Sequence, residues 1–151
     1  MSGTRQAGAA HAISLATRFC LLLALLPIGC ASADPEPQVD GGYLFGSEGR
    51  PQFDFIAVTF DSLVASQVEA QLALPLSQRN LFINGPIDRG DGGHNLDWKW
   101  HYLPSKWAMV ELSIEVCDGT PDSLDADLNY WVDTIGQFCP WSVRVLERLY
   151  D

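Results

Sequence analysis

The segments IEVCD at residues 114–118 and FCPW at residues 138–141 decide the fold of this chain. The first lies where a strand with alternating side chains is predicted to end, and the second follows the end of a predicted helix. Each segment contains one cysteine with apolar residues beside it. The pattern predicts a small exported domain in which a disulfide joins the two segments.

The first thirty residues have the features of a secretory signal. Two arginines precede an apolar run over residues 19–28, and a membrane-spanning helix would need roughly 20 apolar residues. Two cleavage points remain open, a lipoprotein-type box that ends at Cys30 and a plain small-residue site near residue 33. We therefore expect a signal peptide over residues 1–30 and an extracytoplasmic protein. It would be either a lipoprotein of the bacterial cell envelope or a secreted protein.

The charge of the chain limits its partners. The net charge is −10, and all nineteen acidic residues but only seven of the nine basic residues follow Cys30, so the exported part would carry −12. Binding to nucleic acid needs clustered Lys and Arg, so we expect no nucleic-acid partner. Anionic lipid is disfavoured for the same reason, and membrane attachment would run only through an acyl chain on Cys30.

Cys117 and Cys139 are the two cysteines that remain after the leader, an even number in an oxidising compartment. Neither has another cysteine two to four residues away, which disfavours a zinc site built on them. We predict one disulfide between them, which closes a loop of about 23 residues and contributes roughly 3 kcal/mol. Two reduced, buried thiols are the alternative.

The rest of the chain predicts one folded domain. Residues 31–40 are acidic and rich in proline, which is typical of a disordered tether. Residues 41–151 are long enough to bury one core. The predicted order is β-β-α-β-β-β-α-β, with several connections too short for helical crossovers. This favours an α+β domain with a largely antiparallel sheet, two helices packed on one face and one disulfide.

The predicted elements follow from local patterns. Alternation predicts the strand over residues 109–116 most clearly, with its even-numbered apolar side chains facing the core. The residues NGP at 84–86 are predicted to close a short strand over 81–83. The other predicted strands cover 43–45, 53–60, 98–103 and 143–149, and the helices begin after the N-caps Asp61 and Thr120 and end before Pro75 and at Gly136.

The candidate ligand-binding residues lie around the loop over residues 88–97. This loop begins with three glycines in six residues, and such loops often carry function on a rigid scaffold. Aromatic side chains that follow it can stack on sugars, bases or Pro-rich peptides. The alternative is that the tryptophans belong to the core. The candidates are His94, Asn95, Trp98, Trp100 and His101.

A metal site is a second possibility for the same loop. His94 and His101 are the only histidines outside the leader, and aspartates lie near them in sequence. Two imidazoles and a carboxylate would suit zinc or another first-row metal. No compact ligand motif is present, so the alternative is that both histidines have structural partners. No other cofactor is expected.

Catalytic motifs do not stand out in the sequence. The chain has no Gly-x-Ser-x-Gly, no phosphate-binding loop and no Cys-x-x-Cys. Glu111 and Glu115 would lie about 13 Å apart on a strand, beyond the roughly 5 to 9.5 Å that separates the carboxylates of glycosidases. The sequence therefore favours a protein that is not an enzyme.

Four segments carry a resemblance to a known family. They are INGPI at 83–87, WKWH at 98–101, VCD at 116–118 and FCPWS at 138–142. The chain resembles, over about residues 41–149, a small domain family known from the N-terminal domain of a calmodulin-binding protein and otherwise mostly from exported bacterial proteins. The resemblance implies one compact α+β domain and supports the disulfide, but it supplies no catalytic residues. Calmodulin binding is not implied, because the chain lacks the basic amphipathic helix that calmodulin targets present.

These observations favour a non-enzymatic binding or interaction domain, exported and anchored by a lipid. Its ligand would be a protein or a small molecule, and we expect a monomer. The first alternative is a metal-binding protein or metal-dependent enzyme that uses His94 and His101. The second alternative is a purely structural component of the cell envelope.

Overall fold

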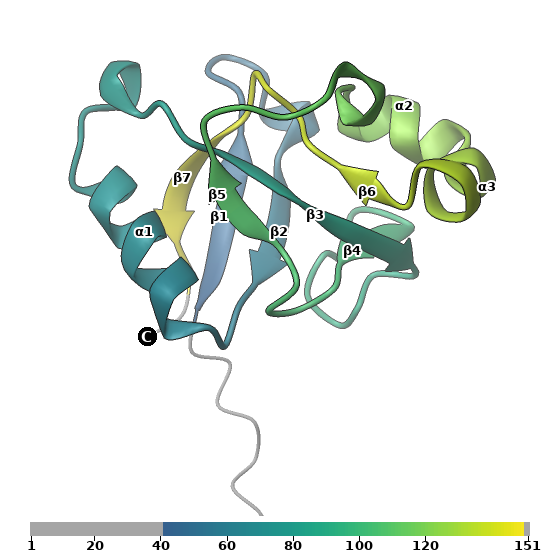
Figure 1. Ribbon diagram of the computed structural model, residues 1–151, viewed down its shortest axis with the longest axis horizontal. Coiled ribbons are helices and arrows are strands. Elements are labelled where there is room, and N and C mark those ends of the chain that lie inside the picture. Colours follow the sequence, from purple (N-terminus) through teal and green to yellow (C-terminus); the bar gives the residue numbers. More distant parts are fainter. Residues whose placement is uncertain (1–40, 150–151) are drawn as a thin grey trace, which may run out of the picture. The chain divides into compact units, whose positions relative to one another are not determined.

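The computed structural model describes residues 41–149, and the predicted signal and tether lie outside them. The described chain is built from short strands and short helices (Figure 1). In order they are β1 (Gly42–Gly46), η1 (Pro51–Phe53), β2 (Phe55–Val58), α1 (Ser62–Leu72), η2 (Leu76–Gln78), β3 (Phe82–Arg89), β4 (Trp100–Tyr102), β5 (Ala108–Val110), η3 (Glu115–Cys117), α2 (Pro121–Ala126), α3 (Leu128–Tyr130), η4 (Trp131–Ile135), β6 (Gln137–Phe138) and β7 (Arg144–Arg148).

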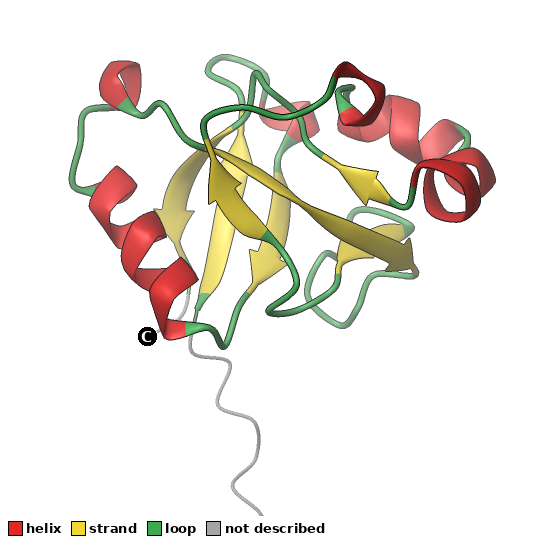
Figure 2. Cartoon of the chain, viewed as in Figure 1, coloured by secondary structure: helices red, strands yellow, loops and turns green. Residues whose placement is uncertain are grey.

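The strands form two antiparallel sheets. The first has the order β2-β1-β7. In the second, β3 pairs along successive parts of its length with β5, β6 and β4. Figure 2 shows the two sheets crossing, with helices at both ends of the crossing. The predicted α+β class with antiparallel pairing is confirmed, and the strands are divided between two sheets because β3 takes its partners from β4, β5 and β6.

Strand β3 passes through the three residues that were predicted to end it, so that prediction is wrong. Gly85 pairs with Phe138 and Pro86 pairs with Gln137 of β6. A Cβ atom on Gly85 would lie 2.5 Å from the Cα of Trp107, so glycine is what lets the two chains approach. Pro86 has no N–H to donate to the sheet, but its carbonyl accepts from the N–H of Leu103 at 3.1 Å.

Strand β5 ends at Val110, so the prediction of a strand over 109–116 is wrong beyond that residue. Val110 pairs with Phe82, the first residue of β3. Just before it, the N–H of Leu81 donates to the side chain of Gln71 on α1, so the chain leaves the sheet there. Residues 111–114 therefore have no strand beside them, and η3 follows.

The helices begin as predicted. The Asp61 side chain accepts from the N–H groups of Leu63 and Val64, and Thr120 forms a capping box with Ser123. The second predicted helix is divided at Asp127, whose φ of −132° is not helical, into α2, α3 and the π-helical turn η4. Helix α1 contacts β7 and β5, whereas η4 contacts β6 and β3.

One hydrophobic core lies between the sheets and the helices. Its centre is aromatic: Trp100 lies 5.3 Å from both Phe55 and Phe138, measured between ring centroids. A smaller cluster contains Phe82 and the disulfide between Cys117 and Cys139. The predicted disulfide is confirmed, and it joins the segment after β5 to the turn after β6.

The disulfide gives the first testable prediction. Both cysteines are fully buried, so Cys117→Ala removes the cross-link and also leaves Cys139 as a buried thiol. We expect the free energy of unfolding to fall by about 2–5 kcal/mol, measured with urea under non-reducing conditions. As a control, thiol counting on the denatured wild-type protein should find no free thiol. Two free thiols would contradict the prediction.

Candidate functional site

The loop that connects β3 to β4 is a tightly bonded turn. The N–H of Gly90 donates to the carbonyl of Lys99 at 2.7 Å, which closes the loop at its base. The carbonyl of Asp91 accepts from His94 and Asn95, and the Asp91 carboxylate accepts from Gly93 at 2.8 Å. The glycines are needed because Gly90, Gly92 and Gly93 all have positive φ angles.

The structure brings His94 and His101 together. Their ring centroids lie 5.7 Å apart, edge to face. Each Nδ1 donates to a carbonyl of the loop, from His94 to Gly92 at 2.9 Å and from His101 to Gly90 at 2.8 Å. A Cβ atom on Gly92 would lie within 2.8 Å of both rings, so Gly92 is packed against the pair.

Burial lowers the pKa of His94, and nearby groups modify this effect. The carbonyl of Gly92 raises the pKa, the neighbouring His101 lowers it, and Asp91 raises it. The Nε2 atom of His94 is buried without a hydrogen-bond partner. The neutral form of His94, with its proton on Nδ1, is therefore the favoured one in the folded protein.

The other three predicted ligand-binding residues have structural partners. The Asn95 amide accepts from the N–H of Ile56 at 2.9 Å and donates to the carbonyl of Trp100 at 2.8 Å. The Trp98 indole is half-buried and donates to the carbonyl of Asp54 at 2.8 Å. Trp100 lies in the core with no exposed surface, so it cannot line a groove.

The described residues show no ready metal centre. Between residues 41 and 149, no three or more His, Cys, Asp or Glu side chains are grouped so that they could hold a metal ion. His94 and His101 are thus a pair of imidazoles without a third ligand beside them.

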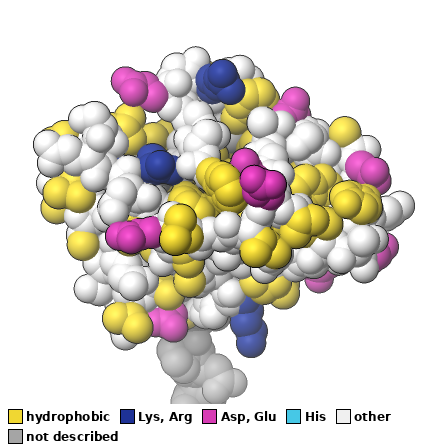
Figure 3. Space-filling model, turned by 45° about the horizontal axis from the view of Figure 1, so that its top comes forward, with side chains coloured by type: hydrophobic (Ala, Val, Ile, Leu, Met, Phe, Trp, Pro, Cys, Tyr) yellow, Lys and Arg dark blue, Asp and Glu magenta, His cyan; other side chains and the backbone are white. Residues whose placement is uncertain are grey.

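An apolar groove lies elsewhere, where the segment after β5 meets the turn after β6. Three apolar side chains of that segment point outward: Leu112 is 87% exposed, Ile114 57% and Val116 53%. Trp141 lies on the opposite side and is 37% exposed. In Figure 3, hydrophobic side chains gather on this side of the molecule with acidic ones among them. Such a patch is typical of an interaction site.

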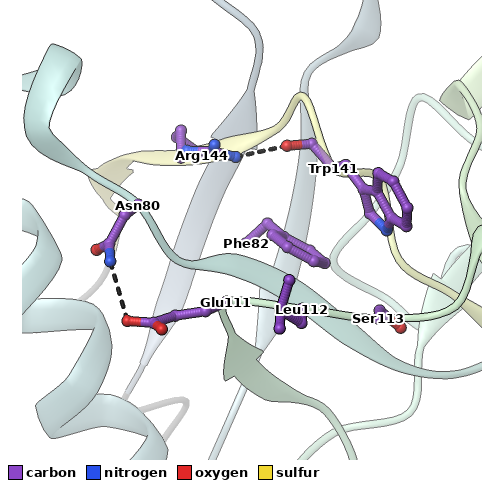
Figure 4. A pocket seen from close by; sticks show the side chains of 7 residues that line it. All are labelled: Asn80, Phe82, Glu111, Leu112, Ser113, Trp141 and Arg144. Atoms are coloured by element: carbon purple, nitrogen blue, oxygen red, sulfur yellow. Dashed lines mark hydrogen bonds between the residues drawn. The ribbon is translucent and has the colours of Figure 1, made fainter.

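A cavity of about 200 Å³ lies within this surface. Phe82, Leu112 and Trp141 form its apolar part, and the rings of Phe82 and Trp141 lie 6.5 Å apart. Figure 4 shows the polar side chains of Asn80, Glu111 and Arg144 toward one end of the cavity and Ser113 toward the other. We call this cavity, with the exposed Ile114 and Val116 beside it, the apolar groove.

Hydrogen bonds hold together the two walls of the groove, which are the segment after β5 and the turn after β6. The N–H of Cys139 donates to the carbonyl of Cys117 at 2.8 Å, beside the disulfide. The N–H of Trp141 donates to the carboxylate of Asp118 at 2.9 Å, which fixes the tryptophan next to the segment that follows β5. At the polar end, the Asn80 amide donates to Glu111 at 3.1 Å. The groove is therefore a preformed surface.

The groove offers apolar surface beside polar hydrogen-bonding groups. Its lining combines aromatic and aliphatic side chains with one amide, one hydroxyl, one carboxylate and one guanidinium, and it includes neither a histidine nor a thiol. The sequence prediction missed this site because Leu112, Ile114 and Val116 were assigned to the core face of a strand. The sequence signal that could have pointed to it is a tryptophan directly after Cys139 and Pro140, outside every predicted helix and strand.

The comparisons with known proteins identify the family. Residues 43–150 match the family model described as the N-terminal domain of BP-74, and the chain belongs to this family. The search of curated proteins found no match, and neither did the search of solved structures. Within residues 41–149, no helix has the length and apolar character needed to cross a membrane.

Proposed function

We propose that this member of the BP-74 N-terminal domain family is a non-enzymatic, extracytoplasmic binding module that docks a segment of a partner protein in the apolar groove. The observation that carries the proposal is the exposure of Leu112, Ile114 and Trp141 around a preformed cavity. Large apolar side chains cost free energy when they face water, so a surface that gathers several of them favours a site that a partner covers.

The size of the cavity favours a single anchor side chain as its occupant. Pockets for drug-sized ligands hold roughly 300–1,000 Å³, whereas this cavity holds about 200 Å³. The apolar surface continues beyond the cavity to Ile114 and Val116, which a small molecule inside it would not cover. A peptide segment would fill the cavity with one side chain and cover the rest, as interface hot spots do.

Export and anchoring complete the proposal. A disulfide in a domain of this size is typical of oxidising compartments outside the cytosol. A signal over residues 1–30 would deliver the chain there, and acylation of Cys30 would attach it to the membrane of a bacterial cell envelope. The tether over residues 31–40 would then hold the binding domain away from the lipid surface.

Metal binding is the second candidate function, and one observation favours it. Both His94 and His101 donate from Nδ1 to backbone carbonyls, which leaves each Nε2 as the nitrogen with a free lone pair. Histidines that ligate metals usually hold their other nitrogen in this way. A metal would have to draw its remaining ligands from water, since no third ligand is grouped with the pair among residues 41–149.

The groove is tested by panning a random peptide library against the purified protein. We expect enrichment of peptides with a large apolar residue, and Leu112→Arg should weaken their binding at least about tenfold by placing a charge at the mouth of the cavity. Leu63→Arg is the matched control, since Leu63 is 68% exposed on α1 and lies outside the groove. Equal losses in both variants, or no enrichment, would reject the groove as the binding site.

The anchor is tested by fractionation and intact mass. If Cys30 is acylated, the protein is found with the membrane, and Cys30→Ala releases it or blocks its maturation. The mass of the wild-type protein then includes the lipid. A mature protein that begins at Asp34 and carries no lipid would instead make it a secreted protein.

The metal alternative is tested by thermal unfolding with zinc or copper added. Binding to the folded state raises the melting temperature by mass action, and a chelator should reverse the rise. His101→Ala should abolish the response and leave the metal-free fold intact, because His101 is only half-buried. Absence of a response to every first-row divalent metal would remove this function.

A further inference from the structure

Two cavities meet at the side chain of Arg144. One is the apolar groove, and the other is a polar cavity of about 250 Å³ on the side of η2. Beside Arg144, the polar cavity is lined by Gly46, Glu48, Leu76, Ser77, Arg79 and Ser142. A ligand in the groove that also reaches this guanidinium would therefore touch both cavities.

The backbone fixes the Arg144 guanidinium in place but does not use all of it. Its Nε donates to the carbonyl of Arg79 at 2.7 Å, and its Nη1 donates to the carbonyls of Trp141 and Val143, each at 2.7 Å. Figure 4 shows the bond to Trp141 at the edge of the groove. Across residues 41–149, Nη2 donates no hydrogen bond, so two N–H groups remain for a ligand.

The charge of Arg144 has no carboxylate partner in the part of the chain that the structure describes. Arg89 pairs with Asp133 at 2.6 Å and Lys99 pairs with Asp125 at 2.9 Å. Among residues 41–149, no carboxylate oxygen lies within 4.0 Å of the Arg144 side-chain nitrogens, although acidic residues outnumber basic ones in the sequence by nineteen to nine. Glu111 and Glu48 line the two cavities without reaching it. The unpaired charge is therefore not a consequence of a shortage of carboxylates.

Partial burial makes this unpaired charge costly. Arg144 is half-buried, and desolvation lowers its pKa from the ordinary value. A half-buried cation without a counter-charge is stabilised when an anion arrives, and hydrogen bonds between charged groups are stronger than neutral ones. Arg79 contributes charge nearby, but its own hydrogen bonds go to the carbonyls at the end of α1 and on β7, so it is a structural clamp.

We propose that the partner segment carries a carboxylate next to its apolar anchor residue, and that this carboxylate binds Arg144 while the anchor fills the apolar groove. The inference rests on the proposed function and specifies its ligand. The carboxylate would come either from the C-terminus of a chain that ends in an apolar residue or from an Asp or Glu side chain beside the anchor. A polyanion is disfavoured, because the net charge of the domain is strongly negative and Arg144 offers one free nitrogen.

The test uses three synthetic peptides with the purified protein and calorimetric titration. The first is an N-acetylated Gly-Ser-Gly-Leu with a free C-terminus, and the second is the same peptide as its C-terminal amide. The third is an amide with Asp placed beside the Leu. We expect at least one carboxylate-bearing peptide to bind about tenfold tighter than the plain amide, and which one it is identifies the source of the carboxylate.

Variants of the protein test whether the preference for a carboxylate depends on Arg144. Arg144→Gln should remove the preference for the carboxylate, so that the acids and the plain amide bind this variant with equal affinity. Arg148→Gln makes the same charge change on the same strand outside both cavities, so it should keep the preference. Because Arg144 also supports the backbone, Arg144→Lys provides a second variant, which keeps the charge and should keep part of the preference. Thermal unfolding of each variant checks its fold.

Three outcomes would overturn the inference. They are equal binding of acids and amide by the wild-type protein, an equal loss of preference in Arg148→Gln, and no binding of any of the three peptides. Equal binding of acids and amide that Leu112→Arg abolishes would leave the groove as a binding site and reject only the role of Arg144. Failure of library panning would reject the proposed function itself.

Discussion

One strand supplies the backbone partner for every other strand of the second sheet, and the rest of the domain depends on this. Strand β3 pairs with β5 over its first residues, with β6 at Gly85 and Pro86, and with β4 over its last residues. Because β3 begins only at Phe82, β5 must end at Val110, and the chain beyond it has no strand to join. That unpaired stretch carries the exposed side chains of Leu112, Ile114 and Val116. The disulfide at Cys117 holds its C-terminal end. The exposed apolar surface is thus a consequence of where β3 begins.

Local chemistry explains what the sequence predicted correctly. Asp61 and Thr120 satisfy helix N–H groups through contacts within three residues, so their roles are visible in the sequence. The pairing of Cys117 with Cys139 followed from their number and compartment. Strand pairing is not local, and an alternating pattern looks the same in a paired strand and in an extended, exposed segment. The strand over 109–116 was therefore predicted too long, and the passage of β3 through Gly85 and Pro86 depends on Trp107, which lies far along the chain.

The candidate site likewise depends on contacts between distant residues that a sequence pattern does not predict. The glycines over residues 90–93 each have a positive φ angle, and backbone hydrogen bonds close the loop, which its glycine content alone does not predict. The rings of His94 and His101 lie close together in the structure, whereas Trp100 lies in the core. The significance of Arg144 could not be read from the sequence, because it depends on which carboxylates fail to reach it in space.

The position of Trp141 also makes the domain convenient to observe. All five tryptophans lie in the described part of the chain, and Trp100, Trp107 and Trp131 are buried. Trp98 is half-buried, and its indole N–H is already bonded to the backbone. Trp141 is the exposed indole among the five, so its fluorescence is the most accessible to a soluble quencher. The domain therefore carries an intrinsic optical reporter at the groove, and the solvent exposure of the groove can be followed there without attaching a dye.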